Sequence, residues 1–203
     1  MWASLSSWLL LGNLAATTAQ GVSPALADSE ARIALLEKQD RLRHRVLRVD
    51  HLSSVQLVPF RQQGSAPLSS RGAILVLHVW SVHCVPCVKE MPELQRMLAS
   101  MKGDGRLRVV FVSQDSAEDL QRYWGEWQQQ LPLAPKFEFY LASPDSQLQS
   151  SLQSTTLPLT LIVDAQMVVR EAFAGPLLER GNQLLSAVRR LCRSAGAECR
   201  AVF

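Results

Sequence analysis

Apolar residues are arranged with two different periods around the middle of the chain. Residues 73–80 form a nearly continuous apolar run, which is typical of a strand buried on both faces of a sheet. Farther on, apolar residues recur every three or four positions, as on a helix that buries one side. They are Val88, Met91, Leu94, Leu98 and Met101. The pattern predicts a buried strand and an amphipathic helix joined by a short turn.

The same two signatures predict the rest of the architecture. An apolar strand follows the helix, and a strand–helix–strand order is typical of parallel strands in one sheet. The further predicted elements are this strand at 107–113, a helix from Ser116 to 131, a strand at 137–141, a short helix opened by 143–145, two antiparallel strands at 159–163 and 167–172, and a closing helix that ends near Cys192. Together they indicate an α/β fold, with helices on both faces of a mixed sheet.

A β-hairpin is predicted ahead of the first buried strand. Alternation over residues 54–60 indicates one strand, and residues 66–68 indicate the second. Between them, residues 61–65 include a glycine and are interpreted as the turn. The 203-residue chain has no internal repeat and no long linker tract, so residues 49–203 are predicted to form one domain.

The N-terminal segment differs in composition from the rest of the chain. Residues 1–27 contain no charged side chain and end in an A-x-A-like cleavage site, which predicts a secretory signal. An uncleaved membrane anchor is the alternative. Residues 28–48 are rich in charge and predict a solvated linker helix, with a basic patch for nucleic acid or lipid headgroups as the alternative. The formal net charge of +3 is too small to indicate a polyanionic partner, and we expect no nucleic-acid binding.

Two cysteines stand where the buried strand ends and the helix begins. Free amide groups and the positive end of a helix dipole stabilise an anion, so a Cys-x-x-Cys pair there can lower a thiol pKa from about 8.5 to roughly 3.5–7.5. Cys84 occupies this position, and Cys87 lies one helical turn farther on. Half of a zinc site is the alternative, but Cys192 and Cys199 are distant and spaced unlike a zinc knuckle. The context favours redox chemistry without a metal.

Two segments of the chain resemble a known family. Residues 80–94 read WSVHCVPCVKEMPEL, which resembles the active-site segment of thioredoxin-like proteins and is most similar to extracytoplasmic TlpA/ResA-type thiol–disulfide oxidoreductases. Residues 157–164 read LPLTLIVD, which resembles that family's cis-proline loop and following strand. The resemblance covers roughly residues 50–190. It implies a thioredoxin-like three-layer sandwich, a mixed central sheet flanked by helices, with an extra N-terminal β-hairpin.

The resemblance also implies an activity and a location. The protein is expected to exchange dithiol and disulfide with protein substrates and with an unidentified redox partner, using no cofactor beyond a Cys84–Cys87 disulfide. We expect it to be extracytoplasmic, in the periplasm, and anchored to the membrane only if residues 1–27 are retained. Pro158 is expected to be cis, and Trp80, Leu157 and Pro158 are expected to contact the substrate.

Cys84 is predicted to be the attacking thiol and Cys87 the resolving one. Glu90 occupies the position of a family acid that tunes the thiols and moves protons, although a surface glutamate is the alternative. Two histidines depart from the family pattern. His78, where an acid or asparagine is common, is interpreted either as a proton acceptor for Cys87 or as a neutral core histidine. His83, where an aromatic residue is usual, either favours the Cys84 thiolate as an imidazolium or has little effect.

The remaining cysteines are predicted to form a structural bridge. In an oxidising compartment, a Cys192–Cys199 disulfide would tie the C-terminal tail to the last helix. A regulatory redox pair is the alternative.

Three other functions are alternatives to thiol–disulfide exchange. A peroxiredoxin-like thiol peroxidase has proline seven residues before its reactive cysteine, where this chain has Leu77, and Thr or Ser three residues before it, where Ser81 fits. A copper-delivery protein needs a histidine downstream of the cysteines, yet all four histidines precede Cys84. A non-catalytic thioredoxin-fold module usually lacks one of the two cysteines, and both are present. Thiol–disulfide exchange is therefore favoured.

Overall fold

A computed structural model describes residues 24–43, 52–57, 60–66, 72–102, 106–127, 137–142, 148, 152, 156–196 and 200–201. Most of the predicted export signal, residues 128–136, and Cys199 lie outside these residues. Of the helix predicted after residues 143–145, the description includes only Leu148 and Leu152, both helical and buried.

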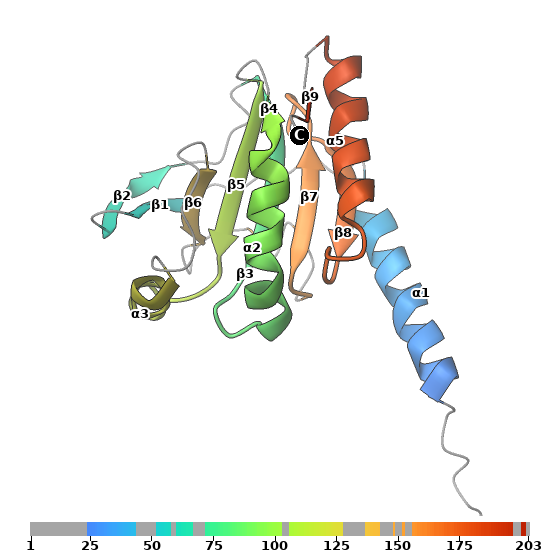
Figure 1. Cartoon of the computed structure of the whole chain (residues 1–203), viewed down its shortest axis with the longest axis horizontal. Coiled ribbons are helices and arrows are strands. Elements are labelled where there is room, and N and C mark those ends of the chain that lie inside the picture. Colours follow the sequence, from blue (N-terminus) through green and yellow to red (C-terminus); the bar gives the residue numbers. More distant parts are fainter. Residues whose placement is uncertain are drawn as a thin grey trace, which may run out of the picture.

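A seven-stranded mixed sheet forms the centre of the protein (Figure 1). In spatial order its strands are β2 (Phe60–Ala66), β1 (Leu52–Leu57), β6 (Phe137–Ala142), β5 (Leu107–Ser113), β3 (Ile74–Trp80), β7 (Leu159–Val163) and β8 (Val169–Ala174). The three central strands, β6, β5 and β3, are parallel, and the outer pairs are antiparallel. A separate small ladder pairs β4 (Met101–Lys102) with β9 (Arg200–Ala201). The predicted fold, a mixed sheet with parallel central strands flanked by helices, is confirmed.

The position of the turn predicted at residues 61–65 is wrong. These residues lie within β2, and the chain instead reverses between Leu57 and Phe60, whose Cα atoms pair. Ser53 pairs with Ser65 while Ser54 pairs with Gln63, so one residue of β2 is left over between the two pairs. That residue is a glycine, which suits a β-bulge as well as a turn. Sequence alone did not separate these two uses.

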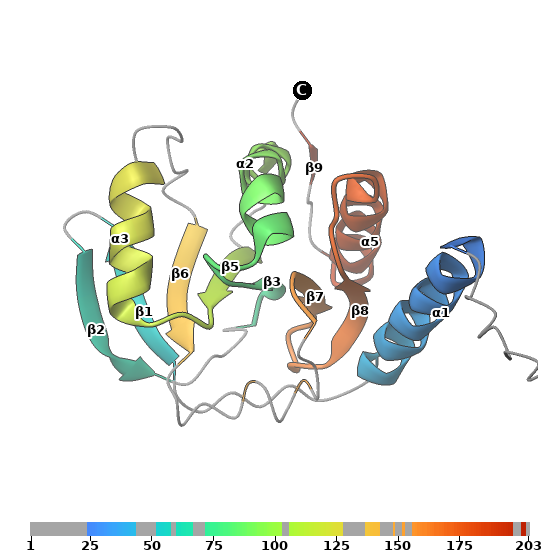
Figure 2. The ribbon, with the colours of Figure 1, turned by 90° about the horizontal axis from the view of Figure 1, so that it is seen from below.

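Three helices cover one face of the sheet. Figure 2 shows α3 (Ala117–Trp127), α2 (Val85–Ala99) and α5 (Gly181–Ser194) side by side on that face. Every residue of β3 is buried, and alternate side chains point to opposite faces of a strand. One set packs beneath the helices in a cluster that includes Ile74, Val76, Trp80, Phe111, Met91, Leu94, Leu98, Leu184 and Val188. Because His78 belongs to the same alternate set, it points toward α2.

The opposite face is covered in part by α1 (Pro24–Leu42). Leu75, Leu77 and Val79 of β3 belong to a second buried cluster, which also contains Leu42, Leu148 and Leu152. Near its end α1 packs beside β8 (Figure 2), and Arg43 just beyond it pairs with Glu171 at 2.9 Å. The end of the expected linker helix is therefore docked on the sheet, while Ile33 and Leu36 stay exposed. None of the helices described here is long and apolar enough to span a bilayer.

Candidate active site

Cys84 and Cys87 lie at the start of α2, just beyond the carboxyl end of β3. Cys84 is the N-cap residue, and its Sγ accepts a hydrogen bond from the Cys87 amide at 3.3 Å. Pro86 suits the first helical turn because an amide at this place would have no intrahelical acceptor. The two sulfurs form a disulfide with an S–S distance of 2.03 Å. Cys87 is fully buried and Cys84 is partly exposed, so Cys84 is the sulfur that another molecule can reach.

The turn before Cys84 is held by a carboxylate that the sequence did not single out. Asp115 accepts hydrogen bonds from the Ser81 hydroxyl at 2.6 Å and the Val82 amide at 2.8 Å. The Ser113 hydroxyl donates to the same carboxylate at 2.5 Å. Trp80 and Ser113 are register partners at the carboxyl ends of two parallel strands. An acid just past such a strand end could have been proposed, because these ends share one edge of the sheet.

Glu90 lies inside the protein, one helical turn beyond Cys87. Its side chain is 1% exposed, so the alternative of a surface glutamate is wrong. Its Oε2 accepts a hydrogen bond from the Leu177 amide at 2.6 Å. Burial raises the pKa of Glu90 to about 7, although the Leu177 amide and the charge of Arg180 both lower it. Glu90 can therefore gain and lose a proton near neutral pH, beside the buried cysteine of the pair.

His78 faces Glu90 from the central strand. Its Nδ1 lies 2.9 Å from Thr160 Oγ1 on β7, and its Nε2 lies 3.9 Å from Glu90 Oε1. The ring is wholly buried, and burial lowers the pKa of His78 to about 3. At neutral pH the imidazole is thus an uncharged core group, as one of the two interpretations of His78 expected, and it also lies beside the one buried carboxyl of α2.

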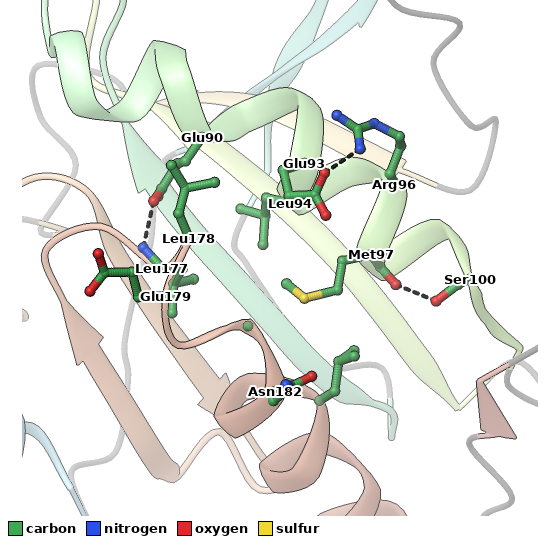
Figure 3. Close-up of a pocket in the computed structure, with 12 residues that line it drawn as sticks. Glu90, Glu93, Leu94, Arg96, Met97, Ser100, Leu177, Leu178, Glu179 and Asn182 are labelled. Carbon is green, nitrogen blue, oxygen red and sulfur yellow. Dashed lines mark hydrogen bonds and ion pairs between the residues drawn. The ribbon is translucent and has the colours of Figure 1, made fainter. Parts of the chain in front are cut away.

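A cavity of about 410 Å³ lies between α2 and the start of α5 (Figure 3). Glu90 and Leu177 form part of its wall, and Figure 3 shows the hydrogen bond that joins them. The charged side chains around the cavity are Glu90, Glu93, Arg96 and Glu179. Neither Cys84 nor Cys87 lines the cavity, so Glu90 forms part of a wall that is separate from the disulfide.

The cis-proline segment lies just before β7, the neighbour of β3 in the sheet. The Leu157–Pro158 peptide bond is cis, and the Pro158 carbonyl accepts a hydrogen bond from the Gly175 amide at 2.9 Å. Leu157 and Cys84 are both partly exposed and both pack against the buried cluster under α2.

One predicted site residue is placed differently from what was expected, and a second is exposed. Trp80 is fully buried, with its ring centroid 5.9 Å from that of Tyr123, so it presents no surface to a substrate. An aromatic residue at the end of a buried strand is part of the core here. His83 is exposed, and its Nε2 lies 3.8 Å from Asp119 Oδ2 on α3. The pKa of Asp119 is lowered, chiefly by its hydrogen bond from Ser116.

The second cysteine pair is described only in part. Cys192 is buried near the end of α5 and is disulfide-bonded. Its predicted partner, Cys199, lies outside the described residues, so their pairing stays a prediction. Across the described ranges, no three His, Cys, Asp or Glu side chains are grouped as metal ligands.

Comparison with protein families matches residues 61–172, more than half of the chain, to the AhpC/TSA family. Three of the solved structures that resemble the chain illustrate the shared fold. A thiol-disulfide isomerase from Corynebacterium glutamicum is 18% identical, with 73% of this chain and 96% of that one covered and a TM-score of 0.53. The thioredoxin domain of a thiol-disulfide oxidoreductase from Bacteroides vulgatus is 19% identical, with 69% and 95% covered and a TM-score of 0.50.

The exposed lipoprotein thioredoxin of Streptococcus pneumoniae is 13% identical, with 68% of this chain and 98% of that one covered and a TM-score of 0.50. At these identities the likeness concerns the fold, and that fold agrees with the strand, disulfide and helix described above. The chain therefore belongs to the AhpC/TSA family, and its fold is the one that these thioredoxin-like structures share.

Proposed function

We propose that this protein is an extracytoplasmic thiol–disulfide oxidoreductase of the TlpA/ResA type, acting on protein thiols and disulfides through Cys84 and Cys87. The observation that carries the proposal is the disulfide at the start of α2, with one partly exposed sulfur and one buried sulfur a helical turn from a buried carboxyl. The names of the solved relatives and the segments at 80–94 and 157–164 support the same class of reaction.

The exchange proceeds in two steps when the protein acts as a reductant. The Cys84 thiolate attacks one sulfur of a substrate disulfide, and the other substrate sulfur leaves as a thiolate. Cys87 then loses its proton to the Glu90 carboxylate and attacks Cys84, which releases the substrate's second thiolate and forms the Cys84–Cys87 disulfide. The substrate gains two electrons and the cysteine pair loses two. Oxidation of a substrate dithiol is the same sequence in reverse.

Each group has a physical reason for its place in this sequence. The start of α2 stabilises negative charge at Cys84, because the first amides of a helix lack intrahelical acceptors. Glu90 has a pKa of about 7, so it can accept a proton from a thiol and return it at neutral pH. Leu157 offers a backbone beside the exposed sulfur, where an extended substrate segment could pair. Pro158 keeps that backbone in place.

Secretion and an unidentified redox partner belong to the proposal as well. The uncharged segment 1–27 supports export to the periplasm, with membrane anchoring if the segment is retained. One of the solved relatives is an exposed lipoprotein thioredoxin, which agrees with a location outside the cytoplasm.

A thiol peroxidase is the competing function within the fold. Ser81, which occupies the peroxiredoxin position for Thr or Ser, already donates its hydroxyl to Asp115, and Leu77 in place of the proline points into the second buried cluster. We therefore expect the reduced protein to reduce insulin disulfides and to consume hydrogen peroxide no faster than a free thiol does. The rates of NADPH-coupled insulin reduction and of peroxide loss check this. Peroxide loss that outpaces insulin reduction would reject the proposed substrate class.

A further inference from the structure

Two buried polar atoms face each other behind the disulfide without a hydrogen-bond partner. His78 Nε2 and Glu90 Oε1 are 3.9 Å apart, and neither atom has a partner among the described residues. Their side chains are 0% and 1% exposed. Buried polar atoms are almost always hydrogen-bonded, because an unpaired one costs free energy of desolvation. The separation exceeds a direct hydrogen bond by less than one ångström, so a small side-chain movement would join the two atoms.

The other polar atom of each side chain already has a hydrogen-bond partner. Glu90 Oε2 accepts from the Leu177 amide, which leaves Oε1 as the oxygen free to carry a proton. His78 Nδ1 is fixed by Thr160 across the β3–β7 ladder, and Phe111 packs edge-on against the ring with centroids 5.5 Å apart. The Thr160 hydroxyl can accept from an Nδ1–H, which leaves Nε2 as an acceptor. A proton carried by Glu90 Oε1 would therefore find a hydrogen-bond acceptor at His78 Nε2.

The surroundings of His78 and Glu90 favour a single proton shared between the two side chains. Burial keeps the imidazole neutral above about pH 3 and keeps the Glu90 carboxyl protonated up to about pH 7, as the pKa directions of both groups indicate. The strands beside His78 contribute Phe111 and Thr160, which carry no charge. Arg180, from the loop before α5, is the cation that acts on Glu90. Glu93, Arg96 and Glu179 lie around the cavity on the solvent side.

We propose that His78 is a positioning residue for proton transfer: in the oxidised protein its Nε2 accepts a hydrogen bond from the protonated Oε1 of Glu90. The proposal rests on the function proposed above, in which Glu90 has taken the proton that Cys87 gave up. The hydrogen bond keeps that proton next to the buried sulfur. When the disulfide is reduced, the Cys87 thiolate takes the proton back and Glu90 becomes a carboxylate. The imidazole stays neutral throughout.

Nitrogen NMR of the oxidised protein, labelled with ¹⁵N-histidine, tests the hydrogen bond without any activity assay. At pH 6 we expect His78 as the neutral Nδ1–H tautomer, with Nε2 unprotonated and shifted by its bond to Glu90. In Glu90→Gln the Nε2 resonance is expected to move, whereas in Glu93→Gln, an exposed site on the same helix, it should stay. A neutral Nε2–H tautomer or an imidazolium in the parent protein at pH 6 overturns the proposal.

The pH dependence of exchange gives a second readout. Loss of the acceptor at Nε2 destabilises protonated Glu90, so in His78→Asn the midpoint of the pH–rate profile should move to lower pH by roughly one unit, the equivalent of one hydrogen bond. In His78→Gln, whose amide can reach toward Glu90, the midpoint should stay closer to the parent. Gln95→Met is the matched control, since Gln95 is another buried polar residue of α2.

The two failures are distinguishable. If the parent and all variants lack insulin reduction, the proposed function fails while the NMR result stands by itself. If exchange proceeds and the His78→Asn midpoint is unchanged or moves to higher pH, the role of His78 is rejected and the function remains. A midpoint shift of equal size in Gln95→Met would also reject it, because any buried polar group would then have the same effect.

Discussion

Replacing Cys84 with serine is expected to abolish exchange with protein disulfides, whereas replacing Cys87 with serine is expected to trap a mixed disulfide through Cys84. The reason is the difference in exposure: a substrate sulfur can reach Cys84, while Cys87 is fully buried. Without Cys87 the first bond still forms, and no second thiolate is available to break it. Insulin reduction measures the first effect, and non-reducing mass spectrometry after mixing with a disulfide-bonded peptide measures the second.

Each variant serves as the control for the other, because both lose the Cys84–Cys87 bond and differ only in which sulfur remains. Insulin reduction that persists in Cys84→Ser would remove Cys84 from the reaction. Mixed disulfides that accumulate in Cys84→Ser but not in Cys87→Ser would reverse the two roles.

Replacing Glu90 with glutamine is expected to slow exchange at pH 7 by roughly 10²- to 10⁴-fold, the usual worth of general acid–base assistance. Glutamine keeps the shape and can still accept from the Leu177 amide, but it cannot take a proton from Cys87. In the parent, the single-turnover rate of substrate reduction should rise with pH and level off above the Glu90 pKa of about 7. That break should vanish in the variant.

Glu93→Gln is the matched control for this experiment. Glu93 lies on the same helix, half exposed, and pairs with Arg96 at the surface, so its replacement should leave rate and pH break unchanged. A Glu90→Gln profile that superimposes on the parent would show that the buried carboxyl takes no part in exchange.

The same variant should alter how stability depends on pH. The pKa of Glu90 is raised from 4.5 to about 7, so its contribution is fully present below pH 4.5 and is lost as the pH rises through 7. The pKa of His78 is lowered from 6.5 to about 3, so its contribution is present above pH 6.5 and is lost as the pH falls through 3. Between pH 4.5 and 6.5 the two groups therefore have opposite effects: as the pH rises, Glu90 lowers the free energy of unfolding and His78 raises it. In Glu90→Gln, urea unfolding should show the free energy of unfolding rising with pH over this window, relative to the parent.

Local sequence patterns predicted the central elements well, because buried positions recur at a regular spacing along a strand or a helix. Strand β5 has the predicted bounds, Leu107–Ser113, and Ser116 accepts the capping hydrogen bond from the Asp119 amide at 3.0 Å. The position of the disulfide at the start of α2 also follows from the apolar run and the helical spacing around it. These features depend on residues close together in the chain.

The properties of the site depend on residues far apart, and these the sequence could not supply. Glu90 tolerates burial because Leu177, 87 positions away, donates its amide to the carboxylate. His78 is fixed by Thr160, which is brought beside it only by the pairing of β3 with β7. Tertiary packing likewise places Leu42 on the sheet, and it brings Asp115 to the turn before Cys84, where it accepts hydrogen bonds. For Trp80 the resemblance implies substrate contact, whereas the apolar run at residues 73–80 predicts the burial that the structure shows.

The reduction potential of the Cys84–Cys87 pair tests the central claim most directly. Equilibration in redox buffers, followed by alkylation and mass spectrometry, gives the fraction of the pair that is oxidised at each poise. A reversible exchange pair should show a single two-electron transition between about −120 mV, as in strong oxidants, and about −270 mV, as in thioredoxin-like reductants. A pair that remains oxidised at potentials below about −300 mV would be a structural disulfide, and that result would contradict the proposed function.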